Sequence, residues 1–506
     1  MSLVNSSNIK MTNGQVWPKP RLQHSYDQYL KLKPDNFHFQ VTGYSCDILD
    51  IQLKRYKRML FLKAINNNEY LNSLSMNFTN EPMKMLNVLL LNPCEDYPSL
   101  NMDEKYEISI NDTNGILLAN SIWGILRGLE TFSQLVTLDK DGSTFVIRCT
   151  SITDYPKFSH RGFLLDTSRH FYPVKSILDT LDAMSYSKLN VFHWHIVDDH
   201  SFPFQSRAFP NLSKKGAYGH SAIYTINDVK LIIEHAKILG IRVIPEFDTP
   251  GHASSWRLGG IPSLLINCSN NIDPNNFGPI DPTVQENYDF IRTLFTEVGE
   301  VFKDQYLHLG GDEVVTACWS NDKRVQAFMQ NNNISNITEL ESYYFKNIFN
   351  ITRTLETVPI VWEEVFDENI RLDPNVVVQI WKNDFNETLQ KVLESGHPVL
   401  LSSCWYLNYI QYGANWMNYY SCDPSNTTTN RSDLILGGEA CMWSEFVDDT
   451  NVLPFSWPSG CAVAEVLWSH VLNKTEAAAR LEEHVCRMKR RGIPARPANG
   501  PNYCSY

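Results

Sequence analysis

The sequence predicts an α/β protein in which a smaller α+β domain precedes a (β/α)8 TIM barrel. From Arg161 onward, short apolar runs alternate with amphipathic stretches, as expected for parallel strands joined by helical crossovers. Eight such runs occur within roughly 350 residues, and eight is the number of strands in this type of barrel. The runs begin at Arg161, Leu189, Ile241, Tyr306, Val358, Val376, Pro398 and Leu434.

The stretches between the runs carry apolar residues at the spacing of an α-helix. In Thr225–Leu239, Val229, Ile232 and Ala236 recur at helical intervals and would lie on one face. The same pattern predicts helices over Val174–Ser187, Val284–Phe302 and Ile337–Arg353.

The first part of the chain lacks this alternation. It contains β-rich segments, a long apolar run that starts at Met85 and a helical pattern that starts at Ser121. We therefore expect an accessory α+β domain over 1–155 and the barrel over 156–506. The boundary is expected in 152–162, where proline and polar residues cluster.

The bulk composition excludes some classes of partner. The net charge is −12, and a nucleic-acid-binding surface needs a basic excess, so we expect no nucleic acid as a partner. A local basic cluster over 487–491 is predicted to be a solvated helix end rather than a binding patch. No apolar run reaches the ~18 residues of a transmembrane helix, so we expect no membrane span.

Other features indicate an exported glycoprotein. Residues 1–10 lack the apolar core of a signal peptide, so we expect a mature chain whose signal has been removed or replaced. The expected location is lysosomal or secreted. Asn-X-Ser/Thr sequons recur along the whole chain, at a density typical of a glycosylated protein. The glycosylation candidates are Asn77, Asn111, Asn211, Asn267, Asn336, Asn350, Asn386, Asn426, Asn430 and Asn473.

The cysteines fit the same interpretation. There are eleven, which permits several disulfides and leaves at least one thiol over. Their spacings lack the tight CxxC pairs of a zinc site. The disulfide candidates are Cys46, Cys94, Cys268, Cys318, Cys486 and Cys504. The connectivity of Cys149, Cys404, Cys422, Cys441 and Cys461 stays open.

The predicted strand ends carry groups that a core normally avoids. They include Arg169, His195, Asp198, Asp199, Glu246, Asp248, His252, Asp312, Glu313, Glu363, Glu364, Tyr406 and Glu445. A barrel of this type has its active site at the carboxyl ends of its strands. Because buried like charges are costly, carboxylates that converge from several strands indicate a functional site.

Three tryptophans follow apolar runs in the same way. Trp362, Trp381 and Trp443 would ring one mouth of the barrel, where indole rings stack on the apolar faces of sugars. Carboxylates and Arg169 would bind the hydroxyl groups. An acidic, tryptophan-lined pocket predicts a neutral polyol such as a pyranose as the ligand.

A metal-dependent hydrolase is one alternative. His193 and His195 lie two apart at a strand end, and with His252 and Asp312 they mimic the metal ligands of an amidohydrolase barrel. The bridging lysine and further histidine of that pattern have no counterpart at the strand ends. A second alternative is a non-catalytic sugar-binding protein of the same fold.

Five long motifs match a known family. They are RGFLLDTSRHFYP from Arg161, NVFHWHIVDDHSFPFQS from Asn190, VIPEFDTPGH from Val243, HLGGDEV from His308 and GGEACMWSE from Gly437. In this order they closely resemble the β-N-acetylhexosaminidases of glycoside hydrolase family 20, especially the animal lysosomal type. The resemblance covers the whole predicted barrel, and the preceding residues resemble that family's accessory domain.

The resemblance implies a retaining exo-glycosidase that removes terminal β-linked GlcNAc or GalNAc by substrate-assisted catalysis. The acetamido oxygen of the sugar attacks C1 and forms an oxazolinium-type intermediate. By motif position, Glu313 is the general acid/base, Asp312 orients the acetamide and Tyr406 bonds its oxygen. We expect Asp312 to stay ionised and to raise the pKa of Glu313 by repulsion.

The other matched positions belong to the sugar pocket. The aromatic walls correspond to Trp362, Trp381 and Trp443, the hydroxyl-binding residues to Arg169 and Glu445, and the pair that holds the acid/base to Asp198 and His252. Asn408 stands where many relatives carry an aspartate, and Tyr409 after it supplies no cation for a 6-sulfated sugar. The family implies no cofactor, and we expect a homodimer.

Overall fold

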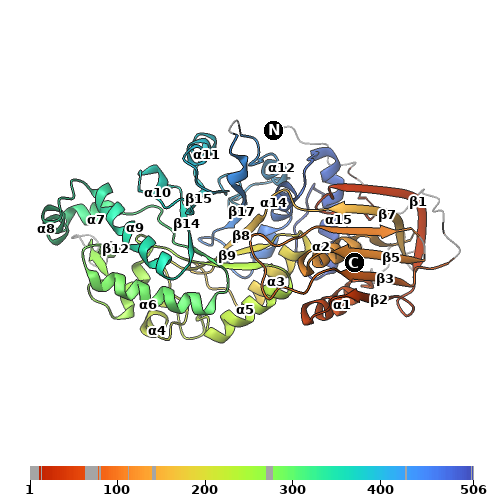
Figure 1. The fold of residues 1–506 in the computed structure, drawn as a ribbon, viewed down its shortest axis with the longest axis horizontal. Coiled ribbons are helices and arrows are strands. Elements are labelled where there is room, and N and C mark those ends of the chain that lie inside the picture. Colours follow the sequence, from red (N-terminus) through yellow and green to blue (C-terminus); the bar gives the residue numbers. More distant parts are fainter. Residues whose placement is uncertain are drawn as a thin grey trace.

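The computed structural model describes residues 9, 11–12, 14–62, 78, 81–111, 113–139, 144–268, 277–427, 430–502 and 504. Figure 1 shows the two predicted parts side by side, with the barrel and its helices at one end and a sheet at the other. In the barrel domain, the strands lie in the middle and the helices surround them.

Eight parallel strands form a closed barrel, which confirms the predicted fold class. Their order is β10-β13-β14-β15-β16-β17-β8-β9, and every pair of neighbours is parallel. The strands are β8 (His160–Asp166), β9 (Val191–Val197), β10 (Arg242–Phe247), β13 (Tyr306–His308), β14 (Val358–Trp362), β15 (Val377–Ile380), β16 (Val399–Leu401) and β17 (Ile435–Met442).

The predicted helices lie between these strands. The stretch around Val229 forms α5 (Ile226–Ile238), which begins with a capping box in which Thr225 and Asp228 bond each other's backbone N–H. The other helices of this part are α3 (Val174–Tyr186), α4 (Asn211–Gly216), α6 (Gln285–Val301), α7 (Thr316–Asn321), α8 (Lys323–Asn331), α9 (Ile337–Thr354), α10 (Glu364–Asp367), α11 (Phe385–Glu394), α12 (Trp416–Tyr419), α13 (Val452–Ser456), α14 (Ser459–Trp468) and α15 (Lys474–Arg490). Loops add η2 (Ser254–Gly259), η3 (Ser432–Leu434) and a hairpin of β11 (Leu265–Asn267) and β12 (Phe277–Ile280).

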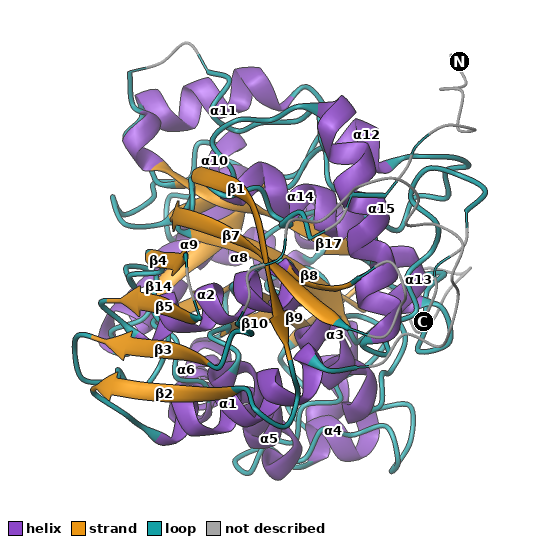
Figure 2. Cartoon of the chain, turned by 90° about the vertical axis from the view of Figure 1, so that its right-hand side faces the viewer, coloured by secondary structure: helices purple, strands orange, loops and turns teal. Residues whose placement is uncertain are grey.

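The first domain is a mixed sheet with two helices. The strands lie in the order β1-β7-β4-β5-β3-β2, and β6 pairs with β7 (Figure 2). They are β1 (Leu22–Leu32), β2 (His38–Gly43), β3 (Met85–Leu90), β4 (Tyr106–Ile110), β5 (Asn114–Ala119), β6 (Val136–Leu138) and β7 (Phe145–Asp154), with α1 (Asp47–Leu60) and α2 (Ile122–Leu135). Every residue of α2 is buried, because the helix lies between this sheet and the barrel.

The contact between the two parts is polar and buried. Glu104 accepts a hydrogen bond from Arg127 of α2 (Nε–Oε1 2.8 Å) and one from Arg161 of β8 (Nη2–Oε1 2.6 Å). Nearby, the ammonium of Lys188 lies 3.0 Å from Asp154 Oδ2. The last strand of the sheet ends at Asp154 and the first strand of the barrel begins at His160.

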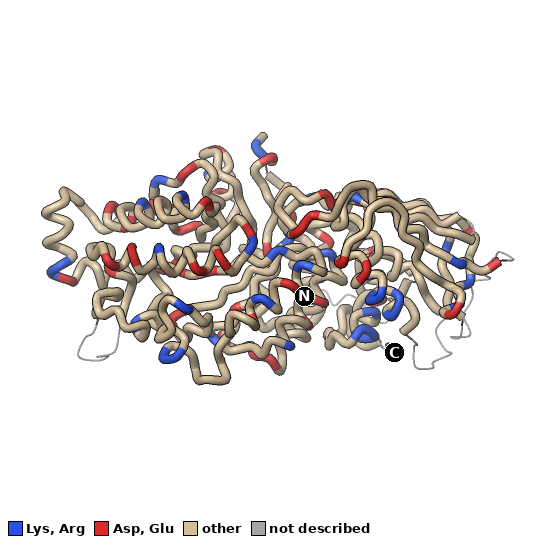
Figure 3. The backbone as a smooth tube through the Cα atoms, turned by 60° about the horizontal axis from the view of Figure 1, so that its bottom comes forward, with Lys and Arg blue, Asp and Glu red and all other residues tan. Residues whose placement is uncertain are grey.

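The basic cluster at the end of α15 is not a solvated helix end, so that prediction is wrong. Arg487 is buried and bonds Glu483 and the side chain of Gln134 in the first domain. Arg491 lies 2.8 Å from Glu130 of α2. Although Figure 3 shows basic residues gathered near this end of the chain, two of the guanidinium groups join the domains. Only tertiary packing decides this burial, and the local sequence does not reveal it.

The six candidate cysteines form three disulfides. These are Cys46–Cys94, Cys268–Cys318 and Cys486–Cys504, and the structure adds Cys404–Cys422. Cys149, Cys441 and Cys461 are buried thiols.

The sequons are at the surface wherever the structure describes them. Asn77 lies outside the described residues, and the other nine candidates are exposed. Two of these, Asn336 and Asn473, are N-cap residues of α9 and α15. Over the described parts of the chain, no helix is both long and apolar enough to span a bilayer.

Candidate active site

Each barrel strand ends in a predicted site residue. Arg169 follows β8, Asp198 follows β9, His252 follows β10, Asp312 and Glu313 follow β13, Trp362 ends β14, Trp381 follows β15, Tyr406 and Asn408 follow β16, and Trp443 and Glu445 follow β17. Because the strands are parallel and closed, their carboxyl ends form one rim, and these side chains share it.

A sharp turn after β13 brings two consecutive acids to the same place. Gly310 and Gly311 have φ of +69° and +98°, and Glu313 also has a positive φ, +49°. A side chain at Gly310 would lie 1.7 Å from Asp248 Oδ1, so the turn requires glycine there. The N–H of Gly311 donates to the same Asp248 oxygen at 3.0 Å. Asp248 therefore packs against the turn, and the turn places Asp312 and Glu313 at the carboxyl end of the barrel.

Both acids face one histidine. His252 Nε2 lies 3.5 Å from Asp312 Oδ2 and 3.6 Å from Glu313 Oε2. On its other side, His252 Nδ1 lies 3.3 Å from Asp198 Oδ1. Asp312 is largely buried, whereas 62% of the Glu313 side chain is exposed at the mouth. The imidazole thus connects Asp198, which is fully buried, to the two acids that face the opening.

Arg169, in the loop after β8, contacts the cluster formed by Asp198, His252 and the two acids. Its Nη2 lies 2.9 Å from Asp198 Oδ2 and its Nη1 3.3 Å from Asp166 Oδ2. The guanidinium also lies over the ring of Trp443, 5.2 Å from the centroid. Burial alone would lower the pKa of Arg169, but Asp166, Asp198 and Glu445 outweigh it, so the cation is fixed at the rim.

Aromatic rings form the opposite side of the mouth. Trp362, Tyr406 and Trp443 lie with ring centroids 6.0 Å (Trp362–Trp443) and 6.4 Å (Tyr406–Trp443) apart, and Trp381 stacks on Tyr406 at 6.2 Å. The indole N–H of Trp381 donates to Glu364 Oε2 at 2.8 Å. These rings form one aromatic cluster at the carboxyl ends of the strands.

Two further predicted residues, Asn408 and Glu445, lie in the loops after β16 and β17. Glu445 is exposed, and its charge acts on Arg169. Asn408 has a buried Oδ1 that accepts no hydrogen bond from the described residues, so this oxygen can accept one from a ligand hydroxyl.

Comparison with known proteins decides the family. The glycosyl hydrolase family 20 catalytic domain matches residues 158–471, and a domain described as beta-acetyl hexosaminidase like matches 16–135. The chain belongs to glycosyl hydrolase family 20.

Family 20 proteins resemble the chain over almost its whole length. The beta-hexosaminidase subunit beta of Mus musculus is 45% identical, with 97% of this chain and 93% of that protein covered. Its counterpart in Homo sapiens is 44% identical, with 97% and 90% covered. Among solved structures, the chitobiase of Flavobacterium johnsoniae superposes with a TM-score of 0.83 at 26% identity, covering 95% of this chain and 73% of that one.

The direction of the pKa shift differs from the prediction for Glu313. The ring of His252, whose Nε2 lies 3.6 Å from Glu313 Oε2, lowers the pKa of Glu313 below its ordinary value, and burial only partly opposes this shift. Burial raises the pKa of Asp312, with His252 opposing. The expected repulsion from Asp312 onto Glu313 is therefore not the dominant effect. The positive charge of His252 reverses the sign for Glu313. The motifs predict that His252 holds the acid/base, but they do not show that its ring lies between the two carboxylates.

The arrangement of His193 and His195 does not favour the metal-dependent alternative. His193 lies 2.7 Å from Glu439 (Nδ1–Oε2) and 3.0 Å from Glu246 (Nε2–Oε2). Burial disfavours a charged ring, but these carboxylates raise the pKa of His193 to about 9. His195 is likewise held between Glu246 and Asp198 at 2.5 and 2.7 Å. Both nitrogens of each ring therefore already face a carboxylate oxygen.

Several polar residues of the barrel interior were missed in the sequence argument. Asp166, His308 and Glu439 lie within buried strands and each contacts a site residue or its partner. Their signal was a polar residue at alternate positions of an apolar strand, which is where side chains point into a barrel.

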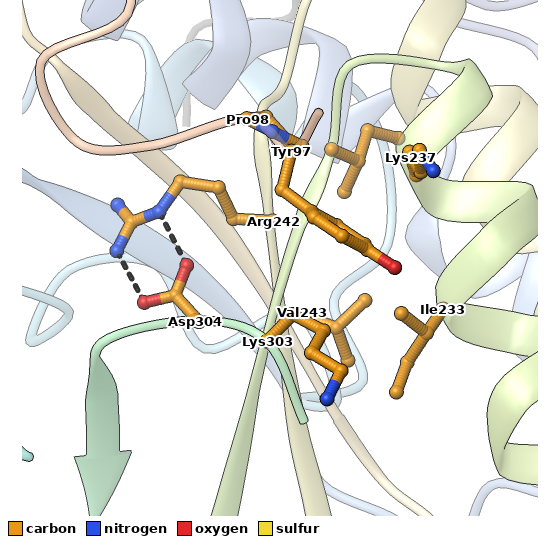
Figure 4. Close-up of a pocket in the computed structure, with 9 residues that line it drawn as sticks. Tyr97, Pro98, Ile233, Lys237, Arg242, Val243, Lys303 and Asp304 are labelled. Carbon is orange, nitrogen blue, oxygen red and sulfur yellow. Dashed lines mark hydrogen bonds and ion pairs between the residues drawn. The ribbon is translucent and has the colours of Figure 1, made fainter. Parts of the chain in front are cut away.

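A small cavity lies at the opposite ends of the strands. Tyr97, Ile233, Lys237 and Lys303 line it, together with Arg242 at the start of β10 (Figure 4). Arg242 is paired with Asp304, with Nε–Oδ2 2.7 Å and Nη2–Oδ1 2.8 Å. None of the predicted site residues lines this cavity.

Proposed function

We propose that the protein is a retaining exo-β-N-acetylhexosaminidase that releases terminal β-linked GlcNAc or GalNAc from glycoconjugates. Membership of family 20 and the similarity to beta-hexosaminidase subunits support this function. One observation carries the mechanism: Asp312 and Glu313 come from a single turn and both face His252. Two carboxylates that act on opposite faces of a sugar would come from different strands, so one of these two serves another atom of the substrate.

The first step consumes the acetamido group as nucleophile. Its carbonyl oxygen attacks C1, the bond from C1 to the glycosidic oxygen breaks, and Glu313 gives its proton to that oxygen. Asp312 accepts a hydrogen bond from the acetamido N–H and stabilises the positive charge of the oxazolinium ring. Tyr406 donates to the acetamido oxygen. In the second step water attacks C1, Glu313 takes the proton, and the acetamide re-forms with overall retention.

The rings beside the acids fit this substrate. Trp362, Trp381 and Trp443 enclose the acetamido methyl and one sugar face, and Arg169 with Glu445 binds ring hydroxyls. A sugar over Glu313 removes water from its exposed carboxyl, which raises its pKa toward the range where it holds a proton. We therefore expect an acidic optimum for turnover.

Variants of the two acids test the function. Glu313→Gln should lose about 10²–10⁴-fold in kcat on an aryl β-GlcNAc, because a positioned proton donor is lost, with folding checked by circular dichroism. The loss should be larger on a disaccharide, whose leaving oxygen needs the proton more. Asp312→Asn should also be severe. Near-normal turnover by Glu313→Gln would contradict the assignment.

A thiazoline mimic of the cyclised intermediate provides a second test. It should inhibit competitively at low concentration, whereas lack of inhibition would contradict the substrate-assisted mechanism. Glycan binding without turnover between pH 3 and pH 8 would instead support a sugar-binding protein.

We propose a homodimer with the barrel mouths at or near the interface. Large apolar side chains are exposed around the mouth: Ile410 is 85% exposed, Phe446 88% and Tyr412 104%. Exposed apolar patches of this kind mark interaction surfaces. Light scattering should give twice the chain mass, and Ile410→Asp should reduce it. A wild-type monomer at all concentrations would contradict the proposal.

We propose an exported protein that is lysosomal or secreted. The exposed sequons and the four disulfides support an oxidising, glycosylating route. Removal of N-glycans from the protein expressed in a secretory host should reduce its mass at several of these sites, and an unchanged mass would contradict glycosylation.

A further inference from the structure

The interior of the barrel holds a buried carboxylate with four nitrogen neighbours. Glu246 on β10 is fully buried. Its Oε1 accepts from the indole of Trp362 at 2.8 Å and lies 3.2 Å from His308 Nδ1. Its Oε2 lies 2.5 Å from His195 Nδ1 and 3.0 Å from His193 Nε2. A carboxylate with so many partners costs little to bury and leaves its neighbours few alternative orientations.

The two oxygens of Glu246 lead to different parts of the candidate site. Through Oε1 the carboxylate holds Trp362, a wall of the proposed acetamido pocket. Through Oε2 it holds His195, whose Nε2 lies 2.7 Å from Asp198. Asp198 in turn contacts Arg169 and His252, and His252 faces both proposed catalytic acids.

We infer that Glu246 is a positioning residue that couples the acetamido pocket to the acid/base group, by holding Trp362 and the His195–Asp198 pair with one carboxylate. This inference deepens the proposed function and rests on it. Glu246 touches no substrate atom; it acts through Trp362 on binding and through His195 on the proton-transferring side. A small displacement of either branch is enough to cost about 100-fold in rate.

The pH dependence expected for a Glu246 variant depends on the charged groups that face this carboxylate. They are His193 and His195 on β9, His308 on β13, and the carboxylates of Asp248 and Asp312, which lie within 4.8 Å of it. Loss of the Glu246 charge lowers the pKa of His195, because this carboxylate is the strongest charge that raises it. His195 would then lose its proton at lower pH, and its bond to Asp198 would weaken there.

Glu439 on β17 provides a matched control. It is equally buried and has three polar partners where Glu246 has four: His160 Nε2 at 2.6 Å, His193 Nδ1 at 2.7 Å and Gln379 Nε2 at 2.9 Å. None of these three belongs to the predicted sugar site. Glu439→Gln therefore removes a buried charge from the barrel without a direct contact to Trp362 or His195, and the partner that it shares with Glu246 is His193.

The experiment compares Glu246→Gln and Glu439→Gln in thermal melting and in pH profiles of kcat and KM on an aryl β-GlcNAc. Both variants should melt at similarly lowered temperatures. Only Glu246→Gln should lose about 100-fold in kcat/KM, with its alkaline limb moved to lower pH. Equal losses and unmoved limbs in both variants would overturn the inference. A wild-type enzyme without turnover would instead overturn the proposed function.

Two milder variants separate the branches and remain informative if Glu246→Gln does not fold. Trp362→Phe keeps a ring but removes the N–H to Glu246, so KM should rise several-fold with a smaller change in kcat. His195→Gln should lower kcat and leave KM within about two-fold of the wild-type value. In this background Glu246→Gln should no longer move the alkaline limb of the pH profile. Unchanged KM in the first variant or unchanged kcat in the second would overturn the corresponding branch.

Discussion

His252 stands between two acids with different tasks, and its charge acts on both. It lies close enough to Glu313 to lower the pKa of that carboxyl, and it opposes the burial that raises the pKa of Asp312. Its own pKa is raised by Asp312 and Asp248 against the effect of burial, so the ring is protonated through the neutral range. One imidazolium therefore sets the pH at which one acid can hold a proton and the other can lose it.

Replacement of this cation should move the pH profile in a defined direction. In His252→Gln the pKa values of Glu313 and Asp312 both rise. In the proposed mechanism activity needs Asp312 ionised and Glu313 protonated, so both limbs of kcat/KM against pH should move to higher pH, with a lower maximum. The measurement is the pH profile on an aryl β-GlcNAc.

His200 supplies the control for this variant. It lies 3.8 Å from Asp198 Oδ1 but is 58% exposed and contacts neither catalytic candidate in the described structure. His200→Gln should leave the limbs where they are in the wild type. Limbs that stay in place in His252→Gln would contradict the role given to this ring.

At the scale of elements, the loop after β13 decides whether two neighbouring acids can share a pocket. Consecutive residues in an extended strand point to opposite sides, so the adjacent pair needs a turn. Positive φ at Gly310, Gly311 and Glu313 provides it, and Asp248 fills the space where a side chain of residue 310 would be. The geometry of this turn therefore determines where the two acids of the candidate site lie.

Gly310→Ala tests the role of this turn. The added methyl meets Asp248, and the backbone is strained, so we expect a loss of about 2–4 kcal/mol in the free energy of unfolding and a large fall in kcat. Gly396→Ala is the control, because Gly396 has φ +86° with no atom within 4 Å of the added carbon. It should cost only the backbone strain of about 1 kcal/mol. Equal denaturant midpoints for both variants would contradict the steric argument.

At the scale of the whole molecule, the accessory domain and the barrel share buried charges. Glu104 of the first domain is bonded by Arg127 and by Arg161 of the barrel. Burial would raise its pKa, but the two arginines outweigh burial and lower it. Its contribution to stability is therefore complete above the ordinary glutamate pKa of 4.5 and is lost only as the pH falls through the lowered value. The contact therefore persists in mild acid.

Glu104→Gln should lower the stability of both domains, because Glu104 bonds an arginine from each of them. The variant leaves two buried guanidinium groups without their carboxylate partner. The free energy of unfolding, measured with denaturant at pH 6, should therefore fall by about 3–5 kcal/mol. Glu107→Gln is the control, because Glu107 pairs with Lys105 at 3.3 Å with both side chains about half exposed, and should cost under about 1 kcal/mol. A small, equal effect of the two variants would contradict the role of Glu104.

The architecture was open to prediction from the sequence because it depends on local patterns. Apolar runs and helical spacing define the eight strands, and the polar ends of those runs define the rim. The sign of the Glu313 pKa shift, the burial of Arg487 and the partners of Glu246 were not predictable in this way. Each depends on side chains from distant strands or from the other domain, and such contacts leave no local pattern.

The most direct test of the mechanism changes the nucleophile and leaves the protein alone. Aryl β-glucosaminides with N-acetyl, N-fluoroacetyl, N-difluoroacetyl and N-trifluoroacetyl groups carry carbonyl oxygens of decreasing nucleophilicity. If the acetamido oxygen attacks C1 beside Asp312, kcat/KM should fall steeply along the series, by at least about 100-fold from first to last. A flat series would contradict substrate-assisted catalysis and assign the nucleophile to the protein.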